Sequence, residues 1–141
     1  MNFYVIAGEP SGDRLGASLI KGLDSILNQP ANFIGIGGPM MKDLGVDSLF
    51  PMEDITIMGI GEILARYRFL KSRILQTAKA IIDARPDALI TIDSPEFNLR
   101  VAELVRKKSD IPIIHYVAPT VWAWRSKRAF RMAKYVDHVL A

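Results

Sequence analysis

Short apolar segments alternate with stretches of helical periodicity along this chain, and the alternation restricts the fold more than any other feature. Apolar runs occupy residues 3–7, 32–36, 88–92, 112–117 and 136–140, and the first four are closed by Gly, Ser, Pro or Ala-Pro. After the first run, Leu15, Leu19 and Leu23 recur at helical spacing, as do Val101 and Val105 after the third. Such a series predicts an α/β fold, a doubly wound and mostly parallel sheet with helices on both faces.

The length and composition restrict the domain count and the possible ligands. With 141 residues, half of them hydrophobic, the chain can form one core but not two full domains. It contains no cysteine and only two histidines, so we expect no disulfide, no zinc site and no cofactor. The net charge of +3 is modest, and no nucleic-acid partner is expected.

Neither end of the chain reads as a membrane signal or anchor. Residues 1–7 lack a basic start and reach Gly8 before any long apolar run, so no signal peptide is expected. No window has the roughly 18 apolar residues that a spanning helix needs. The absence of cysteine and of an export signal fits a cytoplasmic chain. The final residues lie inside an apolar run without a turn, so we expect a chain that is truncated within a larger fold.

Polar residues follow four of the expected strands, at residues 8–13, 37–39, 93–98 and 118–125. Because ligands bind at the carboxyl ends of strands in open parallel sheets, these loops should converge on one cleft. In the first loop, Ser11 is interpreted as a helix N-cap and Gly12 as a packing glycine. Glu9 is left with two roles, a helix cap or a ligand for sugar hydroxyls. The glycine spacing does not fit a dinucleotide-binding loop.

Asp93 is the strongest candidate for chemistry. It ends a buried strand, where partial desolvation suits a general base, and Ser94 and Pro95 can begin the next helix without it. Asn98 is interpreted as an ordinary polar helix position, and His115 and His138 as core histidines. Other loop residues are less specific: Gly37 and Gly38 form a tight turn, and Trp122 and Trp124 either stack on a ligand or pack in the core.

A long helix is expected between residues 60 and 84, with Tyr67 and Ile74 among the side chains that pack on the sheet. Basic and apolar residues are interleaved along the same segment. Two interpretations remain open, contact with anionic lipid and a solvated basic face. The residues concerned are Arg66, Arg68, Phe69, Leu70, Lys71 and Arg73.

Taken in order, the motifs resemble the lipid-A-disaccharide synthase family along essentially the whole chain. They are Gly8-Glu-Pro-Ser-Gly-Asp13, Gly37-Gly-Pro-Met40, Met58-Gly59 before the long helix, Ile92-Asp-Ser-Pro-Glu-Phe-Asn98 and His115-Tyr-Val-Ala-Pro-Thr-Val-Trp-Ala-Trp-Arg125. The resemblance implies a GT-B glycosyltransferase, in which residues 1–141 form an incomplete, Rossmann-like acceptor-side domain. The UDP-binding carboxyl-terminal domain is then absent, and no transferase activity is expected from this chain alone.

The family reaction moves 2,3-diacylglucosamine from its UDP-linked donor onto 2,3-diacylglucosamine 1-phosphate, an acylated acceptor, at the inner membrane surface. The resemblance makes Asp93 the proposed base and Glu9 a second catalytic residue, and it favours peripheral membrane contact through the basic helix. The remaining substrate-binding candidates are Ser11, Gly12, Asp13, Gly37, Gly38, Asn98, Trp122, Trp124 and Arg125. Two alternatives stay open, a non-catalytic remnant that binds lipid or acceptor, and another GT-B sugar-nucleotide enzyme.

Overall fold

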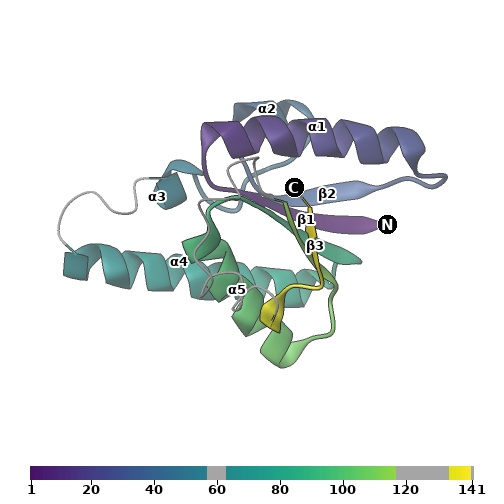
Figure 1. Cartoon of the computed structure of the whole chain (residues 1–141). Coiled ribbons are helices and arrows are strands. Elements are labelled where there is room, and N and C mark those ends of the chain that lie inside the picture. The colour runs from purple at the N-terminus through teal and green to yellow at the C-terminus, as the bar shows by residue number, and fades with distance from the viewer. Residues whose placement is uncertain (57–62, 117–133, 141) are drawn as a thin grey trace.

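The computed structural model describes residues 1–56, 63–116 and 134–140, and it contains a parallel five-stranded sheet between two layers of helices (Figure 1). The strand order is β2-β1-β3-β4-β5. The strands are β1 (Asn2–Ala7), β2 (Asn32–Ile36), β3 (Ala88–Ile92), β4 (Ile113–Tyr116) and β5 (His138–Leu140). The expectation of a Rossmann-like, doubly wound α/β fold is confirmed.

Helices cover both faces of the sheet (Figure 1). Helices α1 (Pro10–Ile26) and α2 (Pro39–Asp43) lie on one face, and α4 (Ile63–Ala84) and α5 (Pro95–Lys108) on the other. The short α3 (Glu53–Thr56) lies beside the carboxyl end of β1, where Ile55 approaches Gly8. No helix in the described part of the chain is long and apolar enough to cross a membrane.

Alternation along β1 divides the core into two layers. Phe3, Val5 and Ala7 pack with the residues of α1 and α2, whereas Tyr4 and Ile6 pack with those of α4 and α5. Strand β3 is buried along its whole length, as expected for a strand with helices on both faces. It pairs with β1, which is buried from Phe3 to Ala7.

Three local expectations are wrong. Ser11 does not cap α1, because the helix begins at Pro10 and Glu9 takes the N-cap position. Tyr67 does not pack on the sheet and is 52% exposed on α4. His138 is exposed rather than buried, because β5 pairs with β4 on one side and is the last strand of the sheet order.

Candidate functional site

The carboxyl ends of β1 and β3 form the point at which the strand order changes direction. The chain passes from β1 to β2 on one side and later returns to β3 on the other. In doubly wound sheets ligands bind outside the carboxyl ends of the strands at such a point. Here the loops after β1 and β3 contain Glu9 and Asp93, so the two predicted catalytic carboxyl groups follow adjacent parallel strands.

The loops after β1 and β3 are in close contact. A Cβ atom at Gly8 would collide with the side chain of Ser94 and lie 2.8 Å from Cγ2 of Ile55. A glycine is therefore required at this point for space. The contact fixes the separation of the two loops and leaves little room for one to move against the other.

The turn after β3 has an unusual backbone conformation. Asp93 and Ser94 are consecutive non-glycine residues in the left-handed region, with φ angles of 46° and 40°. Such residues cost on the order of 1–2 kcal/mol each, and they persist where surrounding structure holds them. Backbone bonds contribute here, because Asp93 N–H donates to the Tyr116 carbonyl at 2.9 Å and Asn98 N–H to the Ser94 carbonyl at 3.0 Å.

Asn98 is a buried clamp on this turn. Its Nδ2 donates to the carbonyl oxygens of Asp93 at 2.8 Å and Ile92 at 3.3 Å, and the residue is 1% exposed. The interpretation of Asn98 as an ordinary polar helix position is wrong, because its amide lies inside the domain. Its Oδ1 has no hydrogen-bond partner among the described residues. A substrate-binding role for Asn98 stays a prediction.

His115 lies beneath the turn, next to Thr91 in the sheet register. Its Nδ1 is 2.7 Å from Oγ1 of Thr91, and the residue is almost completely buried. Burial lowers the pKa of His115 to about 4, although the charge of Asp93 acts in the opposite direction. The imidazole is therefore neutral near pH 7, and the prediction of a core histidine is confirmed.

The loop after β1 contains Glu9, whose side chain does not cap the helix that follows. Glu9 is half-buried at the N-cap position of α1, and its side chain makes no capping hydrogen bond within the described chain. Ser11 is exposed in the first turn. Gly12 packs closely, since a Cβ there would lie 3.4 Å from Cβ of Ala7. Of the two roles left open for Glu9, side-chain capping receives no support.

Asp13 organises the loop after β2. Its buried carboxylate accepts hydrogen bonds from the backbone N–H groups of Gly38 at 2.9 Å, Met40 at 2.9 Å and Met41 at 3.0 Å. A Cβ at Gly38 would lie 2.7 Å from Oδ2 of Asp13, so the glycine leaves space for the carboxylate. Asp13 thus holds the amino terminus of α2 against α1. In the sequence, an acidic residue on the apolar face of a helix is the signal that could have indicated this role.

The two glycines after β2 also line a hollow. It has a volume of about 680 Å³ and extends along residues 37–53. Gly37 itself packs on Met41, whose Sδ would lie 2.5 Å from an added Cβ. Ligand binding by Gly37 and Gly38 stays a prediction, and both glycines have a packing role.

The predicted membrane-contact residues of α4 divide into two groups. Arg68, Phe69 and Lys71 are exposed, whereas Leu70 is partly buried against the core and Arg73 is ion-paired with Asp54 at 2.8 Å. Arg66 is half-buried. The exposed group faces outward from the domain, and the Phe69 ring also lies 4.9 Å from Cζ of Arg73.

Trp122, Trp124 and Arg125 lie outside the described residues, so their predicted substrate contacts stay predictions. Across residues 1–56, 63–116 and 134–140, no group of three or more His, Asp or Glu residues is arranged to hold a metal ion.

Comparison with known proteins identifies the family. A profile described as Lipid-A-disaccharide synthetase matches residues 3–141. This chain belongs to that family. Among its relatives, the lipid-A-disaccharide synthase of Ruegeria pomeroyi is 55% identical over all 141 residues, and that of Rhodospirillum centenum is 48% identical over 139.

The chain spans about a third of the length of these relatives. The alignment covers 100% of this chain but 35% of the Ruegeria pomeroyi protein, and 98% against 35% for the Rhodospirillum centenum protein. The lipid-A-disaccharide synthase of Rhodopseudomonas palustris strain HaA2 gives the same picture, with 50% identity over 98% of the chain and 35% of the relative. The match is therefore to one part of these family members.

Proposed function

We propose that residues 1–141 form the acceptor-side, Rossmann-like domain of a GT-B lipid-A-disaccharide synthase. The complete enzyme would transfer 2,3-diacylglucosamine from its UDP-linked form to 2,3-diacylglucosamine 1-phosphate. Membership of the family and relatives with this name, at 46–55% identity over nearly the whole chain, support the proposal. UDP would be bound by a carboxyl-terminal domain, so the 141-residue chain alone should have no transferase activity.

Asp93 would act as the general base. As the acceptor hydroxyl oxygen forms its bond to the anomeric carbon, its proton passes to the Asp93 carboxylate. The bond from that carbon to the UDP oxygen breaks, and UDP leaves with the electron pair. The observation that supports this assignment is the position of Asp93 in a strained turn at the carboxyl end of β3, where the strand order changes direction.

Glu9 would bind a sugar hydroxyl at the same edge of the sheet as Asp93. Its carboxylate follows β1, which pairs directly with β3, and its side chain does not cap α1 within the described chain. Carboxylates accept strong hydrogen bonds from hydroxyl donors in partly buried sites. In Glu9→Gln, the neutral amide oxygen would accept a weaker hydrogen bond than the carboxylate does. The substitution should therefore weaken sugar binding as well as lower turnover.

The test uses a chimaera in which residues 1–141 replace the matching part of the Ruegeria pomeroyi relative. We expect transferase activity from this protein, and a fall in kcat of roughly 10²–10⁴-fold for Asp93→Asn. Asp110→Asn is the matched control: it changes an exposed carboxylate two residues beyond the carboxyl end of α5, and its kcat should stay within about twofold of the parent value. Unchanged kcat in Asp93→Asn would contradict the base assignment.

A chimaera that binds the acceptor without turnover would favour the non-catalytic alternative. In that case, Asp93→Asn and Glu9→Gln should weaken acceptor binding, while Asp110→Asn should not. Transfer of a different sugar would instead favour another GT-B enzyme. Turnover of the UDP-linked donor by the isolated 141-residue chain would contradict the proposed need for a second domain.

We further propose that α4 contacts the cytoplasmic face of the inner membrane. Tyr67 and Phe69 are 52% and 39% exposed, and the nearby Arg68 and Lys71 are exposed cations. Basic side chains beside exposed aromatic ones suit an anionic bilayer surface. Vesicles of phosphatidylglycerol and phosphatidylethanolamine should bind an Arg68→Gln, Lys71→Gln double variant more weakly than a Lys21→Gln, Lys42→Gln control. Equal binding would contradict the membrane contact.

A further inference from the structure

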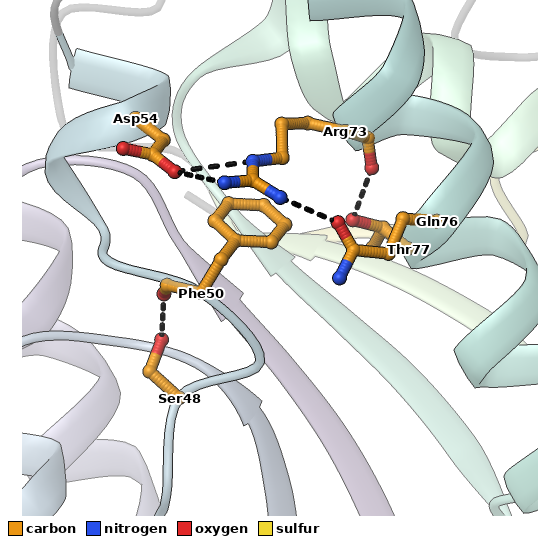
Figure 2. Close-up of polar contacts among 6 residues, drawn as sticks. All are labelled: Ser48, Phe50, Asp54, Arg73, Gln76 and Thr77. Carbon is orange, nitrogen blue, oxygen red and sulfur yellow. Dashed lines mark hydrogen bonds and ion pairs between the residues drawn. The ribbon is translucent and has the colours of Figure 1, made fainter.

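Arg73 joins α4 to the short helix α3 through a forked ion pair (Figure 2). Its Nε and Nη2 donate to Oδ2 of Asp54 at 3.1 and 2.8 Å, and its Nη1 donates to Oε1 of Gln76 at 2.8 Å. The Arg73 and Asp54 side chains are only 26% and 18% exposed. Partial burial strengthens such a pair. Lysine cannot reproduce the planar arrangement of the two donors, because its ammonium group is a compact point charge.

Two aromatic rings hold the guanidinium of Arg73. Its Cζ lies 4.7 Å from the ring centroid of Phe50 and 4.9 Å from that of Phe69. Phe50 is buried and packs edge-on against Phe97 of α5, with ring centroids 6.4 Å apart. The ion pair is therefore built on the hydrophobic core between α4 and α5, and the position of Arg73 is fixed from several sides.

Asp54 belongs to the helix that supports the carboxyl end of β1. Two residues later, Oγ1 of Thr56 donates a hydrogen bond to the Gly8 carbonyl oxygen. Ile55 is buried, and its Cγ2 would lie 2.8 Å from a Cβ at Gly8. Gly8 directly precedes Glu9. Any displacement of α3 would consequently move a support of the Glu9 loop.

The same cluster reaches the loop after β2. Oγ of Ser48 donates to the Phe50 carbonyl oxygen at 2.6 Å (Figure 2) and accepts from the Gly37 N–H at 3.1 Å. Segment 48–56 therefore contacts Arg73 on α4 and two strand-end loops of the sheet. It forms a continuous set of packed and hydrogen-bonded groups from α4 to the carboxyl ends of β1 and β2.

We propose that Arg73 is a positioning residue for the active site. Through Asp54 and α3 it holds the carboxyl end of β1, and with it Glu9, in place beside the Asp93 turn. Its charge serves the interior of the domain, in contrast to the exposed Arg68 five residues earlier on the same helix. The consequence for activity rests on the proposed transferase function, whereas the consequence for loop order does not.

The experiment compares Arg73→Gln with Arg68→Gln in the chimaera, because both variants remove one cation from α4. Hydrogen exchange followed by mass spectrometry should show at least tenfold faster exchange in residues 8–13 and 53–56 for Arg73→Gln than for the parent. Arg68→Gln should leave the exchange rates of these residues unchanged. The kcat of Arg73→Gln should fall at least tenfold, with KM for both substrates within threefold. Arg73→Lys should recover little of the exchange protection or of kcat, because lysine lacks the planar pair of guanidinium donors.

Asp54→Asn is a second variant, in case Arg73→Gln does not fold, and it should reproduce both effects. Unchanged exchange in residues 8–13 for the folded variants, or the same change in Arg68→Gln, would overturn the proposal. So would full recovery of exchange protection and kcat in Arg73→Lys. An inactive parent chimaera would count against the transferase function alone, because the exchange measurement still decides the positioning role.

Discussion

The buried carboxylate of Asp13 provides the sharpest test of how the strand-end loops are held. Its Oδ1 accepts hydrogen bonds from two backbone N–H groups and its Oδ2 from one, and the residue as a whole is 2% exposed. The bond to the Met41 N–H is buried, and the other two are partly buried. Hydrogen bonds to a charged group contribute about 1.5–3 kcal/mol each. Asp13→Ala, which loses all three, should therefore lower the free energy of unfolding by about 5 kcal/mol.

Asp13→Asn separates charge from shape. Its amide oxygen can keep the two bonds to the Gly38 and Met41 N–H groups, whereas its amide nitrogen would face the Met40 N–H, a donor against a donor. The variant loses one hydrogen bond, and the two that remain are to a neutral oxygen instead of a charged one. The free energy of unfolding should therefore fall by about 3 kcal/mol. The difference between Asn and Ala is the expected value of the two retained bonds.

Urea unfolding of the 141-residue chain, followed by circular dichroism, measures these differences. Asp24→Asn is the matched control, since it removes an exposed carboxylate from the same helix and should change stability by less than about 0.5 kcal/mol. If Asp13→Asn costs no more than Asp24→Asn, the carboxylate does not hold α2, and the reasoning from its three hydrogen bonds fails.

Three further predictions address other parts of the structure. Asn98→Ala should release the Asp93 turn and lower the kcat of the chimaera at least tenfold, with substrate KM values largely unchanged; a selective rise in KM would indicate direct substrate binding. Gly35→Ala should destabilise by more than about 2 kcal/mol in urea, because Gly35 has φ of +148° and a Cβ there would collide with the Val5 carbonyl, whereas Gly22→Ala in open helix surface should be neutral or stabilising. His115 has a folded pKa of about 4, below the unfolded value of 6.5, so the unfolded state binds more protons between these values. Stability should rise with pH across that window by at most about 1.4 kcal/mol per unit, and His115→Phe should reduce the slope, as measured by urea unfolding at pH 4.5, 5.5 and 6.5.

The sheet could be predicted because apolar runs and turn residues are local signals. The expected boundaries of β2 and β3 coincide with the observed ones, and the expected helices follow β1 and β3. The capping of α1 could not be predicted from Ser11, because Pro10 was equally able to begin the helix one position earlier. The expectation that His138 is buried failed because β5 is the last strand of the sheet order, and the residues of one strand do not reveal its place in that order.

The candidate site was predictable only in outline. Strand-end position marked Asp93 and Glu9, and the sheet order then placed them after neighbouring strands. The left-handed backbone at Asp93 and Ser94 left no signal in residue types, because neither is a glycine. The clamp by Asn98 depends on the fold of that turn, and the bonds of Asp13 join residues about 25 positions apart, beyond any local pattern.

The basic residues of α4 show most clearly what charge in a sequence leaves undecided. Arg68 and Arg73 have the same side chain and lie five positions apart, which on a helix turns them toward different directions. One is exposed to solvent, and the other lies over the Phe50 ring in an ion pair with Asp54. Aromatic and acidic residues brought by segment 48–56 decide this difference. A row of basic residues on a helix therefore predicts contact with a membrane only when the cations that pair inside the domain are left out of the count.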